Sequence, residues 1–185
     1  MGIYLGTIFS DFIKNETIGE DVIIKYKDIL PGELIETWKR YGYGTFLNGF
    51  IKVINPDEYL DILERSYLRC EQAIPIFATA MGDLIVWEKG MYANLINYRK
   101  GYVNVVSSGF EFFFDDLKDP DFMNDELMWQ PYPDAIRTFS APDFDDCFGY
   151  TPLLGLGGNE KVENLRKVKL KEHILVITEF RGPVQ

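Results

Sequence analysis

Apolar residues recur at helical spacing in the N-terminal half of the chain. Within segment 30–44, Leu34, Ile35 and Trp38 fall on one helical face, a proline precedes them and two glycines follow. A second helix is predicted for PDEYLDILERSYL, because Asn55 before it suits an N-cap and its first turn is acidic. Residues 8–14 also favour a short helix, although their β-branched content weakens that pattern.

Short apolar runs separated by turn residues predict strands in the middle of the chain. The sequence TFLNGFIKVIN, residues 45–55, indicates a strand or a hairpin that turns at Asn48-Gly49. Segment 74–106 contains three or four such runs, separated by Gly82-Asp83, Lys89-Gly90 and Lys100-Gly101. This spacing is typical of an antiparallel meander.

Prolines and phenylalanines then alternate with carboxylates over residues 109–139. This pattern predicts two or three short helices with phenylalanines facing inward and carboxylates outward. FGYTPLLGLGG (148–158) predicts a strand, NLRKVKL another, and KEHILVITEF either a helix or a strand. The order predicts an α+β fold in a single domain, an antiparallel β-sheet meander flanked by helices.

The length and charge of the chain restrict the classes of function that it can have. A chain of 185 residues with 46% hydrophobic residues suits one domain. Its net charge of −10 lies almost entirely in segment 111–146, which holds eleven acidic and two basic residues. Such a field repels nucleic acid and attracts a basic partner or metal ions, although a solvated acidic face is the simpler interpretation. No signal sequence and no apolar run of about 18 residues is visible, so we expect a cytoplasmic protein without a membrane partner.

Candidate catalytic motifs are incomplete. A glycine-rich turn precedes Lys161, but Glu160 intrudes before the lysine and Val162 replaces the hydroxyl residue of a phosphate-binding loop. The single histidine, His173, lacks a nucleophile motif, and two cysteines form no metal or disulfide pattern. We predict no catalytic residue, cofactor or metal. Carboxylate pairs such as Asp115/Asp116 leave a metal-dependent enzyme or regulator as an alternative, and a general protein-interaction adaptor as another.

Three blocks carry a family resemblance: LPGELIETWKRYGYGTFLNGFIKVINPDEY, IPIFATAMGDLIVWEKG and CFGYTPLLGLGGNEKVENLRKVKLKEHI. Their order resembles the GAD-like domain family of bacterial proteins, which includes immunity proteins against DNase toxins delivered by type VI secretion. The first block more distantly resembles the SMI1/KNR4-like immunity superfamily, whose core is an antiparallel sheet flanked by helices. The resemblance implies one GAD-like immunity-type domain over residues 1–185, non-enzymatic, that binds a cognate secreted toxin, with a nuclease as one candidate.

The acidic helical segment at about 111–146 lies outside the best-matching blocks. We expect this segment to determine toxin specificity. A basic toxin surface would be attracted by its carboxylates and held by its aromatic rings. The predicted partner-binding residues are Asp115, Asp116, Asp119, Asp121, Phe122, Trp129, Asp143, Phe144, Asp145 and Asp146.

Overall fold

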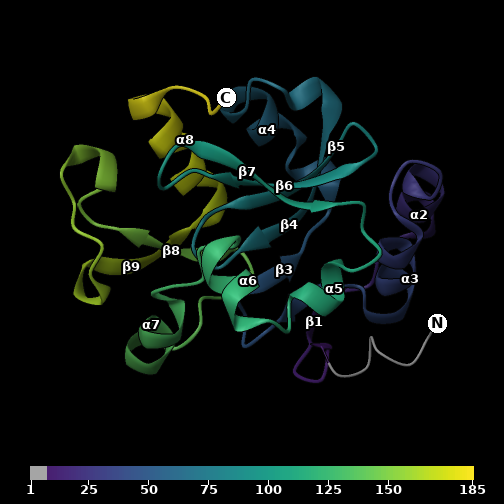
Figure 1. The fold of residues 1–185 in the computed structure, drawn as a ribbon, viewed down its shortest axis with the longest axis horizontal. Helices are drawn as coiled ribbons and strands as arrows, with labels where there is room; N and C mark the ends of the chain where they lie inside the picture. Colours follow the sequence, from purple (N-terminus) through teal and green to yellow (C-terminus); the bar gives the residue numbers. More distant parts are fainter. Residues whose placement is uncertain (1–7) are drawn as a thin grey trace.

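Seven antiparallel strands in chain order form the central sheet (Figure 1). The structure is a computed structural model and describes residues 8–185. Each strand pairs with the next, as in a meander, and two further strands form a separate small sheet. The strands are β1 (Ile13–Glu16), β2 (Tyr43–Phe46), β3 (Ile51–Val53), β4 (Ala73–Thr79), β5 (Leu84–Glu88), β6 (Tyr92–Asn97), β7 (Tyr102–Ser108), β8 (Asp146–Tyr150) and β9 (Leu165–Lys169).

Helices cover both faces of the large sheet (Figure 1). The α-helices are α2 (Glu20–Tyr26), α3 (Gly32–Tyr41), α4 (Leu60–Ser66), α5 (Phe113–Asp116), α6 (Pro120–Asp125), α7 (Tyr132–Phe139) and α8 (Leu170–Arg181). Short 3-10 turns are η1 (Pro56–Glu58), η2 (Cys70–Gln72), η3 (Leu154–Leu156) and η4 (Val162–Asn164). Within residues 8–185, no helix combines the length and apolarity needed to cross a membrane.

Alternation along the strands divides the core into two clusters. We call the face that carries Phe77 and Leu95 the first face, and the face that carries Val86 and Ile96 the second face. Buried residues of α3, α5 and α6 join the cluster on the first face, whereas those of α4 and α8 join the cluster on the second face. The sheet is therefore the middle layer of an α+β fold.

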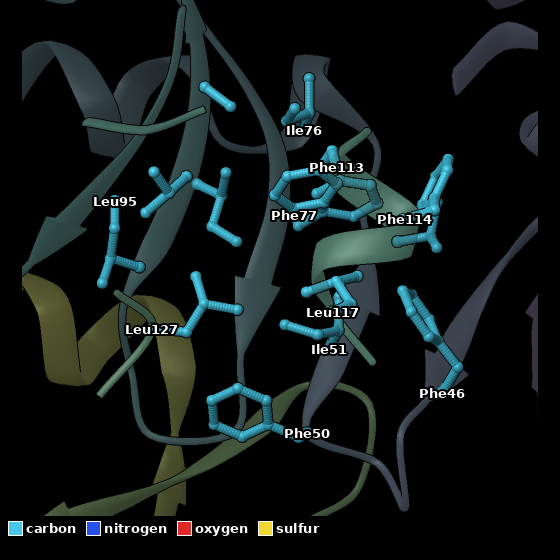
Figure 2. Packing of buried hydrophobic residues seen from close by; sticks show 14 of the residues in the cluster. Phe46, Phe50, Ile51, Ile76, Phe77, Leu95, Phe113, Phe114, Leu117 and Leu127 are labelled. Carbon is cyan, nitrogen blue, oxygen red and sulfur yellow. The ribbon is translucent and has the colours of Figure 1, made fainter. Parts of the chain in front are cut away.

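Aromatic packing holds α5 on the first face. The ring of Phe113 stacks on that of Phe77 with centroids 5.6 Å apart and planes 7° from parallel. Phe114 and Leu117 are also buried, and Figure 2 shows Phe113 directed toward Phe77 and Leu117 toward Ile51. Their carboxylate neighbours point outward as predicted, because residues at helical spacing share one face.

Most of the predicted elements are confirmed. The helix in segment 30–44 is α3, and β2 and β3 form the hairpin expected around Asn48-Gly49, both of which have positive φ. Asn55 accepts a hydrogen bond from the backbone N–H of Asp57 at 3.1 Å, but its helix is broken into η1 and α4. The meander is β4–β7, and the acidic segment holds the short helices α5, α6 and α7.

Two local predictions are wrong. Residues 13 and 14 belong to β1, not to a helix, because pairing with β2 outweighs the weak helical pattern. The strand expected over 148–158 ends at Tyr150, and the chain then turns through a cis Thr151-Pro152 bond and η3. β8 begins at Asp146, so the acidic segment ends in a strand. The ambiguous last element is the helix α8, which buries Leu170, His173, Ile174 and Ile177 at helical spacing.

Candidate functional site

The outer surface of α5 and α6 carries a compact group of acidic side chains. Asp115, Asp119 and Asp121 are exposed there, and Asp116 is half-buried. The Asp119 carboxylate accepts a hydrogen bond from the N–H of Asp121 at 2.9 Å and so caps α6. Lys118 Nζ lies 2.5 Å from the Asp115 carboxylate. We call this group, with Asp125 and Glu111, the acidic surface.

Like charges repel within the acidic surface. Partial burial and then the charges of Asp115 and Asp119 raise the pKa of Asp116 above its ordinary value. The helix backbones fix these carboxylates near one another, because α5 and α6 are docked through their apolar sides. A cation brought to this surface would relieve the repulsion, so the arrangement favours a positively charged partner.

Phe112 is the exposed aromatic ring of this surface, with 62% of the residue accessible to solvent. Its sequence neighbours Phe113 and Phe114 are buried. Helical spacing places Phe110, Phe113, Phe114 and Leu117 toward the sheet, which leaves the ring at position 112 outside. The sequence prediction omitted Phe112, although the same spacing distinguishes it from its neighbours.

The remaining predicted acids lie elsewhere, around the buried Lys52. Lys52 projects from the second face, because Ile51 and Val53 on either side of it join the cluster on the first face. Its Nζ donates to the backbone carbonyls of Asp143 at 2.5 Å, Phe144 at 2.9 Å and Asp146 at 2.6 Å. Three acceptors need the three N–H groups of an ammonium, although burial lowers the pKa of Lys52 to about 8.

The structure therefore separates the seven predicted aspartates into two groups. Asp115, Asp116, Asp119 and Asp121 share the helices that cover the first face, whereas the backbone of 143–146 is held by a side chain from the second face. Asp146 also pairs with Lys169 Nζ at 2.5 Å across β8 and β9. A basic partner that binds α5 and α6 therefore does not find Asp143, Asp145 and Asp146 on these two helices.

The three predicted aromatic anchors are half-buried. Phe122, Trp129 and Phe144 each pack against the hydrophobic core. The Trp129 ring lies 6.5 Å from that of Phe50, edge to face, and its buried indole N–H has no hydrogen-bond acceptor among residues 8–185. These rings stabilise the fold, and only part of each is available to a partner.

Two of the groups that suggested other chemistry, His173 and Cys147, lie in the interior. Burial lowers the pKa of His173 to about 4 and raises that of the Cys147 thiol to about 12. In the glycine turn, the backbone at Gly158 lies close to that of Pro152. A Cβ at Gly158 would be 2.0 Å from the carbonyl oxygen of Pro152, so the glycine is needed for the turn. No group of three or more His, Cys, Asp or Glu side chains in the part of the chain from residue 8 onward is arranged to hold a metal ion.

A buried ion pair ties the acidic helices to the sheet. The guanidinium of Arg99 donates to the Asp83 carboxylate from Nε at 2.9 Å and from Nη2 at 2.6 Å. The same Nη2 donates to the carbonyl of Met128 at 3.2 Å, in the connection between α6 and α7. Arg181 of α8 donates in turn to the carbonyls of Arg99 and Lys100. Asp83 lies in a predicted turn, and no local pattern in the sequence pairs it with Arg99.

Comparison with known families divides the chain into two matched segments. Residues 4–99 match the GAD-like domain, and residues 107–181 match the family described as T6SS immunity protein Tdi1, C-terminal. The boundary between them falls in the β6–β7 hairpin. Strands β1–β6 lie in the first segment, whereas helices α5–α8 and the small sheet of β8 and β9 lie in the second. The acidic surface lies in the second segment.

The overall fold also occurs in a solved structure. The crystal structure of Atu4351 from Agrobacterium tumefaciens superimposes with a TM-score of 0.70 at 17% sequence identity, covering 92% of this chain and 86% of that one. No curated protein sequence matches the chain. At this identity the likeness concerns the fold alone.

Proposed function

This chain belongs to the GAD-like domain family and carries a type VI secretion immunity segment, and from this premise we propose that it binds and neutralises a cognate secreted toxin. The observation that carries the proposal is the position of the acidic surface, which lies on two docked helices of the immunity segment 107–181. We infer that the protein acts by binding in the cytoplasm and without catalysis of its own.

The acidic surface favours a toxin with a basic contact region. Long-range attraction between opposite charges raises the association rate, whereas apolar contacts that exclude water slow dissociation. Phe112 supplies such a contact, because its ring is exposed next to Asp115 and Asp116. A nuclease toxin fits this chemistry, since an enzyme that binds a polyphosphate backbone presents cationic side chains in its cleft.

The proposal is tested first by co-expression. The C-terminal domain of a secreted toxin encoded by the gene next to this chain's own is expressed in a bacterial host with and without this protein. We expect growth arrest by the toxin alone and rescue by the pair. Absence of rescue, with both proteins present in the cell, would contradict an immunity role, and binding without rescue would indicate a general adaptor.

The surface is tested by charge removal. We compare the variant D115N/D116N/D119N/D121N with the control D61N/E64Q/E71Q/E172Q, which removes four exposed acids elsewhere on the chain. Biolayer interferometry with the purified toxin domain at low and physiological salt measures association. We expect the first variant to associate about tenfold more slowly, with a weaker salt dependence. Equal rates for the two variants would exclude the acidic surface as the toxin contact.

A further inference from the structure

β7 is an open edge of the large sheet. It pairs only with β6, and residues 102–108 make no other backbone hydrogen bond within the part of the chain that the structure describes. Its register with β6 is regular from Tyr102 to Val105 and shifts between Val105 and Ser107. An edge strand presents a row of unpaired N–H and C=O groups to any strand that approaches it.

The composition of β7 favours strand pairing. Its sequence YVNVVSS contains no charged residue, no proline and no glycine, and Val105 is 54% exposed. The opposite edge differs. β1 has only four residues, carries Lys14 and Glu16, and has an irregular register with β2 between these two residues. Charge and irregularity are the usual protections of an edge strand. β1 has both, whereas β7 has a register shift near its C-terminal end and no charge.

β7 also borders the acidic surface. Asn104 Nδ2 donates to the Glu126 carboxylate at 2.6 Å, at the C-terminal end of α6. The exposed Asp125 is the last residue of the same helix. A strand added to β7 would therefore run beside carboxylates on its first-face side, where basic side chains of that strand would be attracted.

We propose that β7 accepts an extended segment of the toxin as an eighth strand of the sheet, with basic side chains of that segment facing α6. The inference rests on the proposed toxin-binding function. Backbone hydrogen bonds supply affinity in this mode, and the side chains on alternate positions supply specificity. A second copy of this chain is disfavoured at the same edge, because it would bring two acidic surfaces together on molecules of net charge −10.

Hydrogen exchange on the complex tests the proposal directly. Full-length protein is compared alone and with the purified toxin domain by mass spectrometry. We expect slower exchange in residues 102–108 and in α5–α6, and unchanged exchange in β1. Protection of α5–α6 without protection of β7 overturns this inference and leaves the proposed function intact, whereas absence of any binding contradicts the proposed function. If β7 is protected in the absence of toxin and light scattering shows a dimer, the edge is occupied by a second copy of the chain. That result also overturns the inference.

A pair of matched lysine variants provides a second test. Val105→Lys places a charge on the β7 edge, and the control Ile13→Lys places the same charge on β1, where Ile13 is 70% exposed. We expect toxin affinity to fall about fivefold for V105K, since it removes a cross-strand contact, and to stay unchanged for I13K. Circular dichroism checks that both fold. Equal affinities for folded V105K and I13K overturn the proposal, and the exchange experiment decides the case if V105K does not fold.

Discussion

Polar side chains in the interior connect parts of this chain that are distant in sequence. Lys52 holds the 143–146 backbone through three carbonyls, and Arg99 joins Asp83 to the carbonyl of Met128. Each of these charges is buried, so its partners compensate the loss of water. Removing one partner is therefore expected to lower the free energy of unfolding more than removing both partners.

We expect Arg99→Met to destabilise the protein by about 3–5 kcal/mol, because the buried Asp83 carboxylate loses its counter-charge. The double variant Asp83→Leu with Arg99→Met removes both charges and should recover part of this loss. Urea denaturation followed by circular dichroism measures the free energies of unfolding. A double variant as unstable as the sum of the two single variants would contradict a compensating pair.

The single histidine predicts a pH dependence of stability. His173 is 8% exposed, and burial followed by the charge of Arg99 lowers its pKa from 6.5 to about 4. Between these values the unfolded chain binds a proton that the folded chain does not, so stability falls as the pH falls through this window. From pH 7 to pH 5 we expect a loss of about 2 kcal/mol from this residue. Urea denaturation at both pH values should show a smaller loss for His173→Leu, and equal losses would contradict the assignment.

At the scale of elements, α5 depends on its docking. A helix of four residues has no independent stability, so aromatic contacts with the sheet must hold it in place. Phe113 supplies them through Phe77 and Phe110, whose centroids lie 5.6 and 4.9 Å from its own. Phe112, on the other side of the chain, is 62% exposed and buries much less of its surface than Phe113 does. Phe113 thus stabilises the fold, and we propose that its neighbour Phe112 contributes to binding.

We expect Phe113→Ala to lower the free energy of unfolding by about 3–5 kcal/mol, because it leaves a cavity against the sheet. Phe112→Ala should change stability by less than about 0.5 kcal/mol, yet weaken toxin binding by more than about 1 kcal/mol. Chemical denaturation and isothermal titration calorimetry with the toxin domain measure the two effects. Unchanged affinity of a folded F112A protein would exclude Phe112 from the interface.

At the scale of the whole molecule, the two family segments contribute to one hydrophobic core. Their boundary lies at the β6–β7 hairpin, and the cluster on the first face contains Ile85 and Leu95 of the first segment together with Phe113 and Leu127 of the second. Neither segment can bury its half of this cluster alone. Arg99 of the first segment also donates to Met128 of the second.

We therefore expect one cooperative unfolding transition. Trp38 and Trp87 lie in the first segment and Trp129 in the second, so fluorescence of W129F reports the first segment and that of W38F/W87F the second. For each variant, the unfolding transition measured by tryptophan fluorescence should coincide with the transition measured by circular dichroism. Separate midpoints within either variant would show that the segments unfold independently.

Much of the fold is predictable from the chain because the information is local. Helical spacing in α3, the Asn48-Gly49 turn and the turn residues of the meander each identify an element from its own sequence. The concentration of negative charge in segment 111–146 is likewise a property of the sequence, and it identifies a basic partner as the chemistry to test. The same periodicity distinguishes Phe112 from Phe113.

Only the tertiary structure decided which of these elements meet. Asp115 and Asp143 belong to one acidic stretch of the sequence. Asp143 nevertheless lies at a different place in the fold, because Lys52, which is 91 residues earlier, binds its backbone carbonyl. The helical state of α8 and the strand state of β1 also depend on partners elsewhere in the chain, since their own residues suit either conformation. Local spacing specifies the type of an element where one pattern is clear. Burial and pairing across long sequence separations determine the type of the ambiguous elements, the place of every element and what its surface can bind.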